Sequence, residues 1–238
     1  PEQQGARRVV VSRPGAAAVV QVAYHAPDAR SKDWAALTVL DAVMSGAKSP
    51  SLFGGGAQTN RSARLYRSLV EGELAANASS SFMATIDPFL FELSATVRPD
   101  RTPAEVEQAL YTEVEKLQNT AVSAAELAKI QRQMRAQIVY TTERITNQAM
   151  LLGMWETLDS HRRIDTLLDD ITAVSAADVQ RVAQHYLAAT KRTVGHFIPT
   201  AQGGGSAGPA TQIAAFSPEL HRAKKLWFYN QPAASADS

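Results

Sequence analysis

The chain has 238 residues, of which 45% are hydrophobic and 20% are charged, and its formal net charge is +1. This composition is typical of a globular domain with a sizeable core and excludes a disordered chain, and the charge gives no sign of a nucleic-acid partner. The apolar stretches are too short for a membrane helix, so no membrane partner is expected. Cysteine is absent, which excludes thiolate metal sites and a cysteine nucleophile, and leaves both the cytoplasm and the periplasm open.

The N-terminal half predicts strands around one helix. Residues 7–13 (RRVVVSR) and 18–25 (AVVQVAYH) are rich in β-branched residues and flank Pro14-Gly15, so we expect a hairpin or two neighbouring strands. A helix is predicted to start near Ser31 as N-cap and to end at Gly46. Its apolar face is predicted to hold Trp34, Leu37, Leu40 and Met44. The chain starts at Pro1 without an initiator methionine or an apolar signal core, so we expect a fragment of a longer protein.

A glycine-rich segment and two further strands follow. Residues 47–60 predict a loop around Gly54-Gly55-Gly56, which lacks the Lys-Ser/Thr of a phosphate-binding P-loop and is better explained as a loop that a neighbouring domain or a substrate orders. Residues 62–71 predict a helix with Leu65 and Leu69 inward, and residues 74–82 predict a strand. In residues 89–97, apolar side chains alternate with mostly polar ones, which indicates a half-buried antiparallel strand. Its inward residues are predicted to be Phe89, Phe91, Leu93, Ala95 and Val97.

Helices dominate from residue 102 onward. Thr102 with Glu105, and Ser123 with Glu126, read as capping boxes that start two helices. Their inward stripes are predicted to be Val106, Leu110, Val114 and Leu117, and then Leu127, Ile130, Met134 and Ile138. Further helices are predicted at residues 142–158 and 164–171 and after Ser175, and a final strand at residues 192–198. The order predicts an α+β fold, a two-layer sandwich with a mostly antiparallel sheet and helices on one face. We expect one domain over residues 1–200, then a glycine-rich linker and a basic-aromatic tail over residues 201–238.

The residue types that carry catalysis are present without a recognisable arrangement. The histidines have no H-E-x-x-H or H-x-x-E-H spacing and are expected to be packing residues: His25, His161, His185, His196 and His221. The G-x-S-x-G nucleophile motif is missing. We expect a solvated helix surface for the carboxylates Glu113, Glu115, Asp169 and Asp170.

Several segments together resemble the insulinase/pitrilysin family of zinc metallopeptidases. They include residues 40–56 (LDAVMSGAKSPSLFGGG), residues 60–75 (NRSARLYRSLVEGELA), the Asp87-Pro88 turn and residues 174–199. The resemblance covers roughly residues 1–200 and implies the fold of one half of a mitochondrial-processing-peptidase-like enzyme. In that family, two homologous halves close around a peptide, and the catalytic half holds zinc with H-x-x-E-H and a distant Glu.

Because H-x-x-E-H is missing, the chain is similar to the second, inactive half, with no metal of its own and zinc in a catalytic partner. Such halves often hold the substrate with an Arg and a Tyr, but the matching positions here are Val70 and Ala76 or Asn77. The nearest candidates for peptide contact are Arg64, Tyr66, Arg67 and Asn77.

The resemblance implies a catalytic half as partner, in the same polypeptide or a separate subunit, and a peptide as substrate. Two alternatives stay open, a structural or assembly subunit and a stand-alone peptide-binding regulatory subunit. For the isolated chain we expect neither zinc nor hydrolysis.

Overall fold

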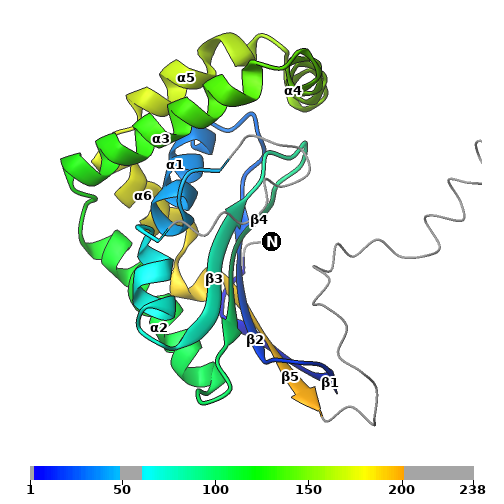
Figure 1. The fold of residues 1–238 in the computed structure, drawn as a ribbon, viewed down its shortest axis with the longest axis vertical. Coiled ribbons are helices and arrows are strands. Elements are labelled where there is room, and N and C mark those ends of the chain that lie inside the picture. Colours follow the sequence, from blue (N-terminus) through cyan, green and yellow to red (C-terminus); the bar gives the residue numbers. More distant parts are fainter. Residues whose placement is uncertain (1–2, 49–60, 201–238) are drawn as a thin grey trace, which may run out of the picture. The chain divides into compact units, whose positions relative to one another are not determined.

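The computed structural model describes residues 3–48 and 61–200. The glycine-rich loop at Gly54–Gly56, the linker and tail of residues 201–238, and His221 lie outside the described residues. Within the described ranges the chain folds into one mixed sheet and a layer of helices (Figure 1). The elements are β1 (Arg7–Pro14), β2 (Val19–Ala26), α1 (Trp34–Ser45), the short π-helical turn η1 (Tyr66–Val70), β3 (Ala75–Phe82), β4 (Phe89–Val97), α2 (Pro103–Asn119), α3 (Ala124–Thr142), α4 (Ile145–Leu158), α5 (Arg163–Ala173), α6 (Ala176–Tyr186), the 3₁₀ turn η2 (Ala189–Lys191) and β5 (Arg192–Thr200).

The sheet has the strand order β1-β5-β2-β4-β3. β2 pairs antiparallel with β4 and β5, and β4 pairs antiparallel with β3, whereas β1 and β5 are parallel. The predicted hairpin or direct neighbourhood of the first two strands is therefore wrong, because β5 lies between them. The ring of Phe197 on β5 lies where a Cβ on Gly15 would stand, at 2.7 Å. The Pro14-Gly15 turn thus leads the chain past β5 instead of folding it back onto β1.

The core lies between one face of the sheet and the helices. α1, α2 and α6 contact the sheet, and α3 and α5 pack on α1, as Figure 1 shows. The predicted stripes of the two helices after residue 102 are all buried, as are Phe91, Leu93, Ala95 and Val97 of β4. Phe89 is 48% exposed, contrary to its predicted inward place; it lies beyond Phe91, the last residue of β4 that pairs with β3. The predicted α+β two-layer sandwich with a mostly antiparallel sheet is confirmed.

Three helix starts differ from the predictions. α1 begins at Trp34 with Asp33 as N-cap residue, and the Ser31 hydroxyl instead accepts a hydrogen bond from the Asp33 backbone N–H at 3.2 Å. The helix predicted over residues 62–71 is a shorter turn in which Leu65 and Leu69 are buried as expected. α4 begins at Ile145 rather than residue 142. Gly46 ends α1 with a φ of 92°, a conformation in which glycine avoids the Cβ clash of other residues.

The helix caps explain how α3 is tied to the rest of the domain. The capping box of α2 is complete, with Thr102 and Glu105 bonded in both directions. At α3 only half of the predicted box forms, because Ser123 accepts from the Glu126 backbone N–H while the Glu126 carboxylate turns to Arg64. The side chain that would have closed the cap therefore joins α3 to the segment before η1.

Candidate peptide-binding surface

One face of the sheet has no described element over it, since the helices all lie on the other side (Figure 1). Strand alternation fixes its members, because Val20, Val22 and Tyr24 of β2 are buried toward the helices and their neighbours point away. We call this surface the open face. It consists of Arg7, Val9, Val11 and Arg13 on β1; Thr193, Gly195, Phe197 and Pro199 on β5; Val19, Gln21, Ala23 and His25 on β2; Leu90, Glu92, Ser94 and Thr96 on β4; and Asn77, Ser79 and Ser81 on β3.

The centre of the open face is built from small and polar side chains. Gln21 lies in register with Ser94 on one side and with Gly195 on the other, and its amide donates to Glu92 at 3.5 Å. Ser79 continues the same row on β3. Such a surface offers close approach and hydrogen-bonding groups to a bound chain.

The four residues predicted for peptide contact lie at the β3 side of the sheet. Tyr66 and Arg67 belong to η1, which contacts β3, and Asn77 is an exposed residue of β3 beside a bulge. Arg67 is exposed and Tyr66 is half-buried. Arg64 precedes η1 and differs from the others, because its guanidinium donates to both oxygens of Glu126, at 2.8 and 2.7 Å. Those hydrogen bonds raise the pKa of Arg64, although burial lowers it.

A buried carboxylate under the β1 edge was not singled out from the sequence. Glu107 on α2 is 6% exposed and accepts hydrogen bonds from Arg8 on β1 at 2.7 and 2.5 Å, from Tyr111 at 2.6 Å and from His196 on β5 at 2.7 Å. Burial by itself raises the pKa of Glu107, but these hydrogen bonds lower it to about 2. We call this group the Glu107 cluster. It ties α2 to the edge of the sheet and makes His196 a structural residue.

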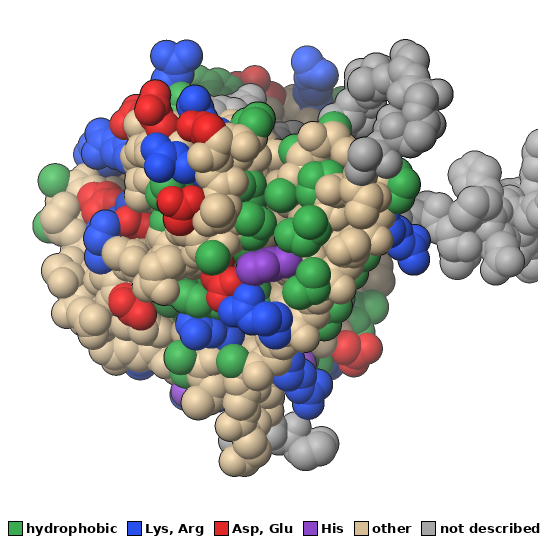
Figure 2. Space-filling view, turned by 90° about the horizontal axis from the view of Figure 1, so that it is seen from below, with side chains coloured by type: hydrophobic (Ala, Val, Ile, Leu, Met, Phe, Trp, Pro, Cys, Tyr) green, Lys and Arg blue, Asp and Glu red, His purple; other side chains and the backbone are tan. Residues whose placement is uncertain are grey.

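The i,i+4 spacing of Glu107 and Tyr111 was the only local signal for this cluster, because Arg8 and His196 are far away in the sequence. Figure 2 shows, on the face seen from below, acidic and basic side chains and a histidine beside one another among hydrophobic side chains.

A second buried carboxylate lies where α1 meets β3. Asp41 is 6% exposed and accepts from the Lys48 ammonium at 2.8 Å with each oxygen, and from the Ser80 hydroxyl. Lys48 also donates to the Ser80 carbonyl at 2.5 Å, and the hydroxyls of Ser45 and Ser80 lie 2.7 Å apart. These hydrogen bonds hold Lys48, just after α1, against both α1 and β3.

The histidines and the other carboxylates do not gather into a metal-binding group in the described ranges. No group of three or more candidate ligands lies within residues 3–48 and 61–200. His161 pairs with Glu156, and His185 packs edge-on against Tyr186. The predicted solvated place of Glu113 is wrong. It is 4% exposed and lies 2.6 Å from the Lys116 ammonium, so its charge is balanced by a neighbour on the same helix.

No described helix is long and apolar enough to cross a membrane. Residues 1–134 match the family model described as the peptidase M16 inactive domain. No curated protein sequence matches the chain.

Solved structures with the same fold include a protease from Helicobacter pylori, with 24% identity and a TM-score of 0.75 over 84% of this chain. The inactive peptidase domain of a proposed zinc protease from Bordetella parapertussis has 25% identity and a TM-score of 0.68, and covers 84% of this chain and 98% of its own. A peptidase M16 inactive domain from Pseudomonas fluorescens shares the fold at 16% identity and a TM-score of 0.66, over 83% of this chain and 44% of its own. The chain spans about half, 46%, of the length of the Helicobacter protease.

Proposed function

Because the chain belongs to the peptidase M16 inactive-domain family, we propose that it is the non-catalytic half of a zinc-dependent endopeptidase. In this proposal it closes a chamber and binds peptide for a catalytic half that carries H-x-x-E-H and the zinc. The catalytic half belongs either to the same polypeptide or to a separate subunit.

The observation that carries the proposal is the open face. A sheet face that buries no described element has its side chains available to a partner or an extended peptide. Zinc hydrolysis needs a shaped cavity that excludes bulk water around the metal-bound water. A second domain can supply the wall of such a cavity without a reactive group of its own, and the polar rows through Gln21 fit that use.

Substrate contacts are assigned to the β3 edge of the sheet. Asn77 is exposed there on the open face, and the exposed Arg67 and the half-buried Tyr66 lie on η1, which contacts β3. An arginine and an amide can donate to peptide carbonyls, and a tyrosine can add its ring and hydroxyl. Arg64 is held by Glu126, so its use would require that ion pair to open.

The test combines the chain with the H-x-x-E-H half encoded in the same reading frame or in a neighbouring gene. We expect a stable complex that cleaves an unfolded, fluorogenic casein in a chelator-sensitive manner. Replacing Arg67 and Asn77 with alanine should raise KM severalfold with little change in kcat, because both residues act on bound peptide only. Arg132→Ala on α3 is the matched control and should change neither. If the catalytic half alone cleaves the substrate as fast as it does with this chain added, the proposal is refuted.

A further inference from the structure

The edge strand β1 is exposed along its whole length. All eight of its residues, Arg7–Pro14, are exposed, and Val9, Val10 and Val11 keep 52%, 58% and 41% of their surface accessible. Its ladder with β5 is unbroken over the strand, without a bulge. β3, at the other edge, is interrupted by a bulge between Ala75 and Asn77. A long, regular, apolar edge is a template for a further strand, because each unpaired N–H and C=O along it can bond to an extended backbone.

The side chains of β1 on the open face form a symmetric pattern. Arg7, Val9, Val11 and Arg13 alternate with residues that point to the helix side, such as Arg8, which reaches Glu107. Among the described residues, the side chains of Arg7 and Arg13 have no hydrogen-bond or ion-pair partner. On the open face, β1 is therefore basic at both ends and apolar between them. The order of charges is the same whether a ligand strand runs parallel or antiparallel to β1.

The charge pattern of β1 decides which kind of strand can pair with its edge. If β1 paired antiparallel with β1 of a second copy about Val10, Arg7 would lie opposite Arg13 of that copy. Like charges directly opposite each other destabilise a strand pair, whereas opposite charges stabilise it. The chain's own run His221–Tyr229 is basic, so as a strand beside β1 it would also bring positive charges toward Arg7 and Arg13.

We propose that the free edge of β1 binds an extended peptide whose alternate residues read acidic, apolar, apolar, acidic. The inference goes beyond the proposed function, since it adds a second peptide-binding site at the edge of the sheet opposite β3 and names its class of peptide. The backbone of the ligand completes the ladder of β1. Its two apolar side chains cover Val9 and Val11, and its two carboxylates lie opposite Arg7 and Arg13. The arginine heads are solvent-exposed, so the charges select the ligand and the backbone and apolar contacts hold it.

The test measures binding of labelled, capped peptides to the full 238-residue chain by fluorescence anisotropy. One peptide carries Glu opposite Arg7 and Arg13, Val opposite Val9 and Val11, and Thr between them. A second carries Lys in place of both Glu residues, and a third is the Glu peptide with alternate backbone nitrogens methylated. We expect the Glu peptide to bind about tenfold more tightly than the Lys peptide, because two cross-strand attractions become repulsions. A fourth peptide is the Glu peptide methylated at the other set of alternate nitrogens. Of the two methylated peptides, the one whose methyl groups face β1 and block the ladder should not bind.

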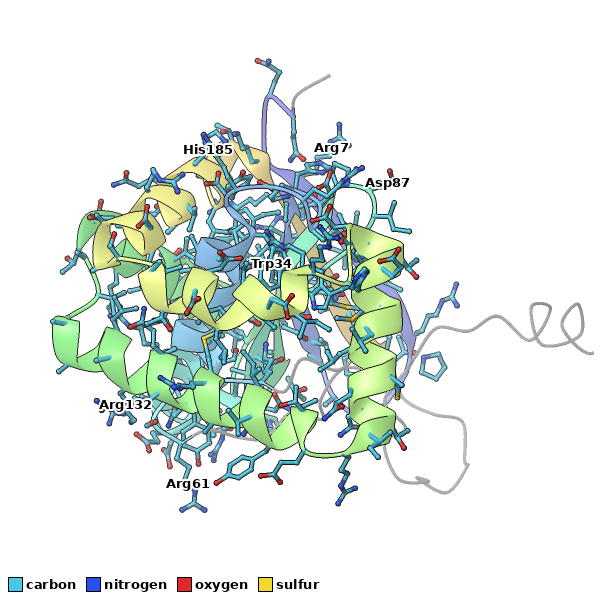
Figure 3. The ribbon with its side chains drawn as sticks, turned by 90° about the horizontal axis from the view of Figure 1, so that it is seen from above. Arg7, Trp34, Arg61, Asp87, Arg132 and His185 are labelled. Atoms are coloured by element: carbon cyan, nitrogen blue, oxygen red, sulfur yellow. The ribbon has the colours of Figure 1, made fainter. Side chains whose placement is uncertain are left out.

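The charge exchange Arg7→Glu with Arg13→Glu should reverse the preference, so that the Lys peptide binds more tightly. Arg132→Glu on α3 is the matched control and should leave the preference unchanged; Figure 3 shows Arg7 and Arg132 well apart. Equal binding of the Glu and Lys peptides, an unreversed preference in the folded exchange variant, or full binding of both methylated peptides overturns the inference. Self-association of the wild-type chain that the exchange abolishes would assign the edge to a second copy and also overturn it.

The outcome is separable from that of the proposed function. If the chain activates the catalytic half but shows no peptide selectivity, only this inference fails. If the selectivity is found and activation is not, the role as a peptidase half fails and the strand-binding edge stands.

Discussion

Replacing Glu107 with glutamine removes the charge that holds α2 to the sheet edge. The pKa of Glu107 falls from 4.5 to about 2 in the folded chain, and each pKa unit corresponds to about 1.4 kcal/mol. The difference of about 2.5 units corresponds to about 3 kcal/mol of stability at neutral pH. Glutamine keeps one acceptor for Tyr111 or Arg8, so we expect Glu107→Gln to lower the free energy of unfolding by about 2 kcal/mol.

The stability difference between wild type and Glu107→Gln should depend on pH. The carboxyl is more acidic in the folded chain than in the unfolded chain, so its contribution is fully present above about pH 4.5 and is lost as the pH falls toward about 2. The gap between wild type and Glu107→Gln should therefore be large at pH 7 and smaller near pH 3. Urea unfolding followed by tryptophan fluorescence measures it, since Trp34 and Trp155 are both buried.

Glu115→Gln is the matched control, because Glu115 is an exposed residue of the same helix. It should change the free energy of unfolding by less than about 0.5 kcal/mol. If Glu107→Gln is as stable as Glu115→Gln, or if its gap to wild type is independent of pH, the stabilising role of the Glu107 cluster is refuted.

The remaining predictions concern the other buried ion pair, the α3 anchor and zinc. Asp41→Asn should lower the free energy of unfolding by about 1–3 kcal/mol, because Lys48 loses its charged partner while Ser80 keeps an acceptor; a urea midpoint equal to that of wild type would contradict this. A double-mutant cycle with Arg64→Ala and Glu126→Ala should give a coupling of about 1 kcal/mol, since the pair is bidentate and only 22% and 31% exposed; additive effects would argue against the anchor. Elemental analysis of the isolated chain should find no stoichiometric zinc, and tight, stoichiometric zinc would contradict its assignment as a half without metal.

Patterns among neighbouring residues were enough to predict the helices and strands that bury one face in the core. β4 was predicted with its observed bounds, because period-two alternation follows directly from a strand with one face on the core. The complete capping box at Thr102 fixed the start of α2 in the same way, because it uses only neighbouring groups.

Contacts between residues far apart in the chain could not be predicted from the sequence. The Val runs of β1 and β2 carry no information that β5, from the far end of the chain, inserts between them. Glu126 has the local signature of a cap, but the guanidinium of Arg64 binds it more strongly than a backbone N–H does. Glu107 is buried for a similar reason, because its cationic partner comes from β1.

The central claim is that the chain completes a zinc peptidase without holding the metal. The most direct measurement titrates the purified chain into a fixed amount of the H-x-x-E-H half and follows chelator-sensitive cleavage of a fluorogenic peptide. We expect a saturable rise in kcat/KM that levels off at equimolar chain, with the zinc remaining on the catalytic half. Cleavage that is complete without the chain, or that the chain supports alone, would contradict it.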